Sequence, residues 1–215
     1  MAASTSPPPD VLLYIASSCA ICPIVHRLLD ELKAQGKIDH LDIVNISEQP
    51  ELARQQGIRS VPWFRIDELE FQGLHSAAEL DYWVSHARSE DGIRKYLSDE
   101  LEAGHLPAIE PLVRRHPDWL RIGLALIADM EAPIQARIGL GAIFEGLQGD
   151  PLLKALVPAL AELTRHSDRR VRGDACYYLG LSAATAARPA LTAALQDADP
   201  DVREIAQDAL QGIPN

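Results

Sequence analysis

Hydrophobic and polar residues alternate over the first part of the chain in a pattern that predicts a strand, a helix and a second strand. An apolar run at 11–16 is followed by residues with helical spacing from Pro23 to about Gln35, where Gly36 ends the helix. A second apolar run follows at 38–46. Because a helix that joins two neighbouring strands makes a crossover connection, we expect these strands to lie parallel in one sheet.

The same kind of pattern continues to about residue 88. Ser47 is expected to cap a short helix that Gly57 ends, and Ser76 with Glu79 forms a capping box at the start of a later helix. Between these helices a β-rich run turns at Asp67 and returns, as a hairpin does. The expected elements of this stretch are a helix at 48–56, strands at 58–66 and 69–73, and a helix at 77–88.

The strand signals disappear after residue 88, and 89–92 marks the expected domain boundary. Everything beyond it has helical spacing, including an expected helix at 152–165, and one phrase of the sequence is repeated. Three of its residues recur 31 positions later: Asp168, Val171 and Arg172 correspond to Asp199, Val202 and Arg203. A looser copy places Arg137 at the position of the two repeated arginines. The repetition predicts helix pairs that stack on one another.

The composition is that of an ordinary globular protein, and it limits the classes of partner. The 215 residues are 47% hydrophobic and 24% charged, with a formal net charge of −11. An acidic chain is poorly suited to the phosphates of nucleic acid, and no stretch approaches the roughly 18 apolar residues of a membrane span. Residues 1–9 lack the basic and apolar regions of a secretion signal, so we expect a disordered leader and a cytoplasmic protein.

The candidate chemistry lies in two cysteines, Cys19 and Cys22, between the first strand and the first helix. Two intervening residues make about one helical turn, which brings the two sulfur atoms within disulfide reach. At a helix N-terminus, free backbone N–H groups and the helix dipole favour the thiolate and lower the pKa of a cysteine. We therefore expect Cys19 to be the attacking sulfur and Cys22 the resolving one.

Other interpretations of these residues are weaker. A zinc site needs more ligands, and the only further cysteine, Cys176, lies in the repeat region, where it is expected to be a buried, inert thiol. We therefore predict no metal. His26 lies four residues beyond Cys22, and it is a candidate to assist deprotonation, although a solvated helix histidine is the more common case.

The order of the first elements, together with Cys-x-x-Cys-Pro and the later Val61-Pro62, resembles the thioredoxin and glutaredoxin superfamily. Within it, the sequence is similar to archaeal glutaredoxin-like protein disulfide oxidoreductases and to the thioredoxin-fold domain of the alkyl hydroperoxide reductase flavoprotein subunit. The resemblance implies that Pro62 is cis beside the disulfide and that the backbone at Val61 pairs with an incoming polypeptide. Trp63 is either an aromatic contact for that polypeptide or a wall of the core. The resemblance implies no cofactor.

The repeated phrase Asp-x-x-Val-Arg-x-x-Ala-x-x-x-Leu resembles HEAT-like repeats. The resemblance implies about eight helices in four antiparallel pairs, stacked as an α-solenoid that binds a protein or peptide. It also implies that acidic and basic residues of the phrase bridge neighbouring repeats. These residues are Asp168, Arg172, Asp199 and Arg203.

The sequence therefore predicts an α/β thioredoxin-like domain at 10–88 followed by an all-α HEAT-like solenoid at 89–215. The expected function is that of a thiol–disulfide oxidoreductase acting on a protein substrate or redox partner that the repeats select, with a thioredoxin-reductase-like protein as a candidate reductant. The alternative is a redox-sensing adaptor or chaperone-like binding protein that works through the solenoid.

Overall fold

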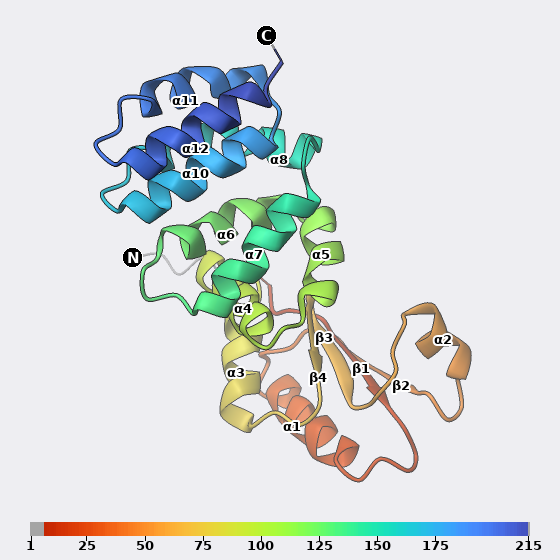
Figure 1. Ribbon diagram of the computed structural model, residues 1–215. Helices are drawn as coiled ribbons and strands as arrows, with labels where there is room; N and C mark the ends of the chain where they lie inside the picture. The colour runs from red at the N-terminus through yellow and green to blue at the C-terminus, as the bar shows by residue number, and fades with distance from the viewer. Residues whose placement is uncertain (1–6, 215) are drawn as a thin grey trace. The chain divides into compact units, whose positions relative to one another are not determined.

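A computed structural model describes residues 7–214 of the chain (Figure 1). The chain divides into two compact units, Met1–Ile93 and Arg94–Asn215. Of the predicted leader, residues 1–6 lie outside the described part. The carbonyl oxygens of the described Pro7 and Pro9 accept hydrogen bonds from Arg88 and from the backbone N–H of Asp39, at 2.8 and 3.0 Å.

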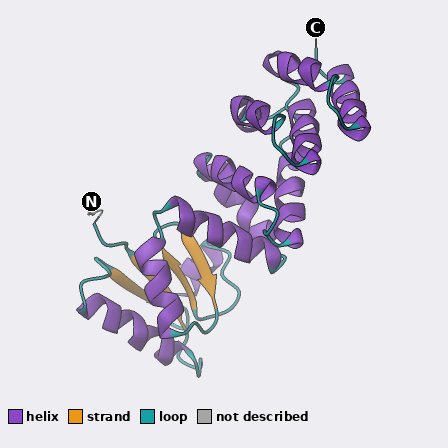
Figure 2. Ribbon diagram, turned by 90° about the vertical axis from the view of Figure 1, so that its left-hand side faces the viewer, coloured by secondary structure: helices purple, strands orange, loops and turns teal. Residues whose placement is uncertain are grey.

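The first unit is a small mixed sheet with helices around it (Figure 2). Its elements are β1 (Val11–Ile15), α1 (Cys22–Ala34), β2 (Leu41–Asn45), α2 (Pro50–Gln55), β3 (Trp63–Ile66), β4 (Leu69–Gln72) and α3 (Ala77–His86). The strand order is β2-β1-β3-β4, in which β1 and β2 are parallel and the other pairs antiparallel. The order of elements and the parallel first pair confirm the expectations from the sequence.

Alternation along the strands explains the core of this unit. Leu13 in β1 lies opposite Phe64 in β3, and Phe64 lies opposite Phe71 in β4; all three are buried. Helix α1 buries Val25 and Leu29, four residues apart on one face, and it contacts both β2 and α3. Each element therefore turns its apolar positions inward.

The helix ends of the first unit follow the sequence signals with one exception. The Ser76–Glu79 capping box is present at the start of α3, and Gly36 and Gly57 take the positive φ angles that end α1 and α2. The expected cap by Ser47 is wrong, because α2 begins later, after Gln49, with no side-chain cap. The Ser47 hydroxyl instead accepts a hydrogen bond from the backbone N–H of Ser17 at 3.1 Å.

The second unit is helical throughout its described residues. Helix α4 begins before the division between the units, and the remaining helices follow it in sequence. They are α4 (Glu90–Glu102), α5 (Leu106–Arg115), α6 (Asp118–Ala128), α7 (Ile134–Gly146), α8 (Pro151–Ala155), α9 (Val157–Leu163), α10 (Arg169–Leu181), the 3₁₀ turn η1 (Thr185–Ala187), α11 (Arg188–Ala194) and α12 (Pro200–Gln211). The single helix expected at 152–165 is divided at Leu156, and Pro158 lies in the first turn of α9. With α8 and α9 counted together, the expected eight helices are present.

The repeated residues have the structural roles that the repeat pattern implies, divided between them. Asp168 and Asp199 cap α10 and α12 by accepting backbone N–H bonds. Arg172 bridges to the loop of the next repeat through a two-pronged pair with Asp197, at 2.7 and 2.8 Å. Arg203 instead donates to the carbonyl of Asp197 in the loop before its own helix. No helix in the described residues has the length and apolar character to cross a membrane.

Candidate functional site

The two cysteines lie where β1 passes into α1. After β1 ends at Ile15, a turn closes through a hydrogen bond from the Cys19 N–H to the Ala16 carbonyl at 3.1 Å, and Cys22 is the first residue of α1. The sulfur atoms are joined in a disulfide, with the Cα atoms 5.5 Å apart. The spacing argument is confirmed, with the difference that Cys19 precedes the helix by a short turn.

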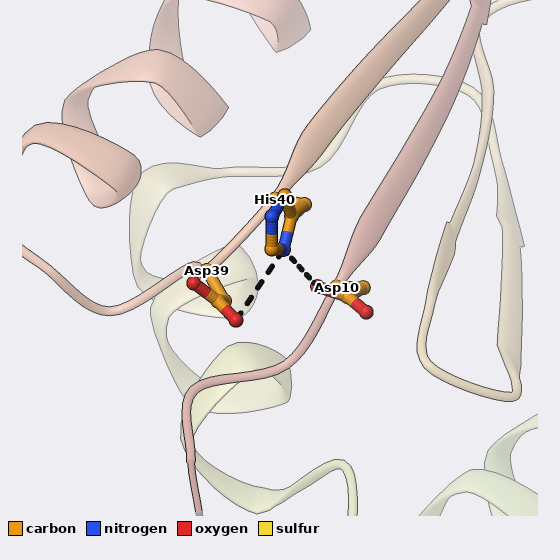
Figure 3. Close-up of side chains that lie close together, drawn as sticks. All are labelled: Asp10, Asp39 and His40. Carbon is orange, nitrogen blue, oxygen red and sulfur yellow. Dashed lines mark hydrogen bonds and ion pairs between the residues drawn. The ribbon is translucent and has the colours of Figure 1, made fainter.

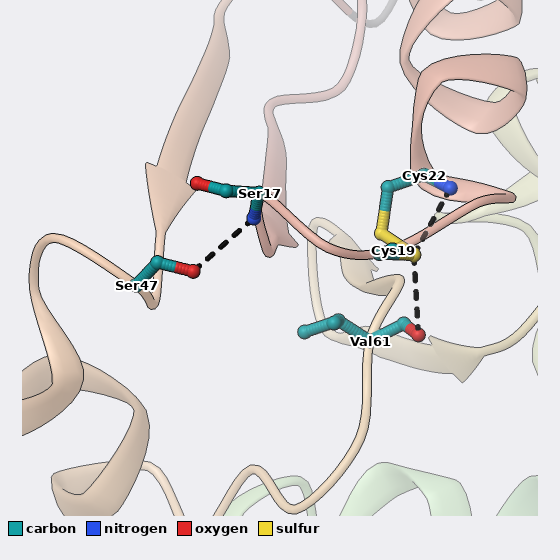
Figure 4. Close-up of a disulfide and its surroundings, with 5 residues drawn as sticks. All are labelled: Ser17, Cys19, Cys22, Ser47 and Val61. Atoms are coloured by element: carbon teal, nitrogen blue, oxygen red, sulfur yellow. Dashed lines mark hydrogen bonds between the residues drawn. A yellow bond between two sulfur atoms is a disulfide. The ribbon is translucent and has the colours of Figure 1, made fainter.

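The Cys19 sulfur lies against the N-terminus of α1 (Figure 4). It accepts a hydrogen bond from the backbone N–H of Cys22 at 3.1 Å. The N-cap residue Ile21 supplies no side-chain bond, and the first turn contains no acidic residue that would offset the helix dipole. The sulfur therefore takes the position that a capping oxygen takes in other helices, where a negative charge is stabilised.

The two sulfur atoms differ in access. Cys22 is buried, with 2% of its surface exposed, whereas Cys19 is partly exposed. A thiol partner can reach Cys19, while Cys22 is within reach of Cys19 alone. The geometry fits the expected division between an attacking and a resolving sulfur.

The predicted substrate-binding residues come next to the disulfide from a distant part of the chain. The Val61 carbonyl oxygen lies 3.7 Å from the Cys19 sulfur, and the Val61–Pro62 peptide bond is cis, as the resemblance implies (Figure 4). The Pro62 carbonyl accepts the N–H of Gly73 at 2.8 Å, which ties this loop to the end of β4. The Trp63 ring packs edge-on against Tyr14, with centroids 5.5 Å apart, so it belongs to a wall of the sheet.

His26 makes a different contact from the expected one. Its Nε2 atom lies 3.0 Å from a carboxylate oxygen of Asp30, one helical turn further from Cys22. The structure therefore pairs this histidine along the helix surface, and its assistance to the thiol stays a prediction.

A polar network supports the loop that carries Cys19, and sequence reasoning missed it. The Ser17 hydroxyl accepts a hydrogen bond from the Asn45 amide at 3.1 Å, and the Ser17 N–H donates to the Ser47 hydroxyl (Figure 4). Asn45 ends β2, the parallel neighbour of β1. The end of β2 thus anchors the turn before the disulfide, and the cluster of polar residues after two parallel strands was the signal for it.

Asp10, Asp39 and His40 gather at the opposite ends of these strands (Figure 3). The His40 Nδ1 atom lies 3.0 Å from Asp10 and 3.3 Å from Asp39. All three side chains are exposed, and the contacts between the histidine and the carboxylates account for their proximity. The cluster gives no support to a metal site.

Cys176 lies apart from this chemistry. It is fully buried in α10, and burial raises the pKa of its thiol to about 11. A thiol that stays protonated is a poor nucleophile, in agreement with the inert role expected for this cysteine.

Comparison with known proteins identifies the helical part of the chain. No curated protein matches the chain, and no family match covers the cysteine pair. Residues 124–211, from α6 to α12, match the family model for HEAT repeats, so this part of the chain is built from HEAT repeats.

Proposed function

We propose that the chain is a thiol–disulfide oxidoreductase with a thioredoxin-like first unit. Three features support this fold: a β1-α1-β2 crossover, an antiparallel β3–β4 hairpin, and cysteines placed directly after β1. The observation that carries the proposal is the position of the Cys19 sulfur, between the N–H of Cys22 and the carbonyl of Val61. It combines a site that favours a thiolate with a backbone edge that can pair with a polypeptide.

The reaction is an exchange of disulfides that moves two electrons. The Cys19 thiolate attacks one sulfur of a partner disulfide, so that a mixed disulfide forms and the partner's other sulfur leaves as a thiolate. The Cys22 thiolate then attacks the Cys19 sulfur, which releases the second partner thiolate and restores the Cys19–Cys22 disulfide. A dithiol reductant, such as a thioredoxin-reductase-like protein would supply, reduces the pair for the next cycle. In the oxidising direction the same steps run in reverse.

The residues of the site have separate parts in this exchange. The Cys22 N–H stabilises negative charge on Cys19 both before attack and when Cys19 leaves the mixed disulfide. Val61 and Pro62 position the partner chain beside the sulfur. The HEAT repeats are the part of the chain suited to select the partner protein, because stacked helix pairs offer an extended surface.

The HEAT match also favours a second candidate, an adaptor or chaperone-like protein in which the disulfide reports redox state. Reduction of insulin with dithiothreitol as the reductant, together with a redox titration, separates the two. An oxidoreductase turns over insulin and loses this activity in Cys19→Ser, while Cys22→Ser accumulates a mixed disulfide on Cys19. Absence of turnover, with partner binding that changes between the oxidised and reduced chain, would favour the adaptor.

A further inference from the structure

A pocket of about 390 Å³ opens between α7 and α10, the second helices of two neighbouring repeats (Figure 1). The next such pair, α10 and α12, is in close contact: a Cβ atom on Gly180 would lie 2.8 Å from the Cβ of Ala209. Between α7 and α10, Tyr178 fills one part of the gap against Gly141, and the rest stays open. The pocket therefore comes from a local separation of helices that pack closely elsewhere in the repeat array.

Exposed apolar side chains gather at this pocket. In the described part of the second unit, the large apolar side chains that are exposed are Met130, Ile134, Ile138 and Tyr177. Ile134 and Ile138 line the pocket, with 57% and 66% of their surface exposed. The Met130 sulfur accepts a hydrogen bond from the pocket residue Arg170, and Tyr177 donates one to the pocket residue Glu145. A contiguous apolar patch beside a pocket is typical of a surface that binds a partner.

The pocket also holds guanidinium groups that lack acceptors. The Nε and Nη1 atoms of Arg137 are buried without a hydrogen-bond partner, as is the Nε atom of Arg170. Asp174, the carboxylate deeper in the pocket, pairs with Arg170 at 3.2 Å. Glu145, at the rim, accepts the Tyr177 hydroxyl. A buried cationic group without an acceptor is costly, so the groups left open belong chiefly to Arg137.

Comparison of the repeats explains why Arg137 is left open. Arg172, at the same helix position one repeat later, pairs with Asp197. Asp197 accepts the N–H of the capping Asp199, and His166 accepts the N–H of Asp168 in the same way, so the two residues occupy equivalent places. The loop that follows Arg137's repeat therefore has a histidine where the next loop has an aspartate. The acid is missing beside the one arginine that faces the exposed isoleucines.

From this juxtaposition we propose that the α7–α10 pocket binds a segment of a partner protein that carries an aspartate or glutamate next to large apolar side chains. The partner's carboxylate takes the place that Asp197 has beside Arg172, and it accepts hydrogen bonds from Arg137. Its apolar neighbours cover Ile134, Ile138 and Met130. Asp174 and Glu145 disfavour a doubly charged group such as a phosphate, which points to a carboxylate. The inference goes beyond the redox chemistry and holds whether or not the cysteines turn over.

A random dodecapeptide library displayed on phage, selected on the full-length chain, tests the proposal. The expected result is enrichment of peptides with an acidic residue flanked by large apolar ones, and none of this enrichment on the Ile138→Glu chain. Because Ile138 is largely exposed, this variant adds a repelling charge without disturbing the core. Leu52→Glu and Arg165→Gln, at exposed sites elsewhere, are matched controls that should keep the enrichment.

Fluorescence anisotropy with the most enriched peptide then tests the pairing itself. Exchange of its acidic residue for the amide should weaken binding to the wild-type chain about tenfold or more, and should have no further effect on Arg137→Gln. His166→Asp restores the acid that the neighbouring repeat has, so it should weaken peptide binding to a similar extent while raising the melting temperature. These measurements are made on the reduced and the oxidised chain, and they do not depend on insulin turnover.

Several outcomes would overturn the proposal. Enriched peptides without acidic residues, or affinities that stay unchanged in Ile138→Glu and His166→Asp, would show that the pocket does not bind a carboxylate. Absence of any enrichment over Ile138→Glu would exclude a peptide site. Sedimentation that shows a dimer of the wild-type chain, dissociated by Ile138→Glu, would assign the patch to a second copy of the chain.

Discussion

The bridge between Arg172 and Asp197 gives a prediction whose size follows from its contacts. Arg172→Ala removes two hydrogen bonds to Asp197 and two more from Nη1 to the carbonyls of His166 and Ser167, at 3.0 Å each. The side chains of Arg172 and Asp197 are only 15% and 9% exposed. The substitution therefore leaves a mostly covered carboxylate and two carbonyl groups without their donor.

The expected cost is about 2 to 3 kcal/mol of unfolding free energy. Removal of one partner from a fully buried ion pair costs about 3–5 kcal/mol, and a hydrogen bond to a charged group contributes about 1.5–3 kcal/mol. The pair joins two loops at the edge of the helix array, where water can relax around Asp197, so the lower part of these ranges applies.

Urea unfolding followed by far-ultraviolet circular dichroism measures this loss. Arg165→Ala is the matched control, because Arg165 pairs with Glu162 while both side chains are more than 70% exposed, and it should change stability by less than about 0.5 kcal/mol. Equal effects of the two substitutions, or a loss below about 0.5 kcal/mol for Arg172→Ala, would refute the reasoning.

The pH dependence of the same measurement tests the cause. The hydrogen bond from Arg172 lowers the pKa of Asp197 in the folded chain. A carboxylate with a lowered folded pKa contributes stability above its unfolded pKa, near 4, and this contribution is lost as the pH falls through the folded value. The difference between wild type and Arg172→Ala should therefore be complete at pH 7 and shrink below about pH 4.

Three further predictions concern the sulfur atoms and the helix contacts. In the reduced chain, alkylation against pH should show that the pKa of Cys19 is below that of a free cysteine, and a value at or above it would remove the basis for Cys19 as nucleophile. Cys176→Ala should leave insulin reduction unchanged, since this thiol is buried and protonated; a tenfold loss in a folded variant would contradict that. Gly180→Ala should destabilise the chain by about 1–3 kcal/mol, because the new methyl group meets Ala209, including its backbone, within 3.0 Å. Gly173→Ala, which meets only the tip of a side chain at 3.3 Å, should be near neutral, and equal thermal shifts for the two variants would argue against the close helix contact.

Most of the fold could be predicted because its signals are local. Alternating strands, glycine helix ends and the Ser76 capping box depend on neighbouring residues, and the order of elements in the first unit was correct. Ser47 was misassigned because the partner of its hydroxyl, Ser17, lies 30 residues away on the adjacent strand end. The predicted helix at 152–165 was divided because Pro158 favours a new first turn, which helical spacing alone does not show.

The candidate redox site was predictable for the same reason, and its surroundings were not. Spacing alone placed Cys19 and Cys22 within disulfide reach. The approach of Val61 to Cys19 came only from a family resemblance, since the two residues are 42 positions apart and meet through the pairing of β1 with β3. His26 was expected near the cysteines from its helix position, yet a carboxylate one turn away, Asp30, is its observed partner.

The repeat array shows how a functional position can be found by comparison within one chain. A structural arginine is expected to keep its acidic partner in every copy, as Arg172 does with Asp197. Where the arginine remains and the partner changes, as at Arg137 and His166, folding no longer explains the charge. The sequence contained this signal, because the offset of 31 residues aligns His166 with Asp197. It could be interpreted only once the structure showed that Arg137 lines a pocket with exposed isoleucines, and this combination directs attention to a ligand that brings its own carboxylate.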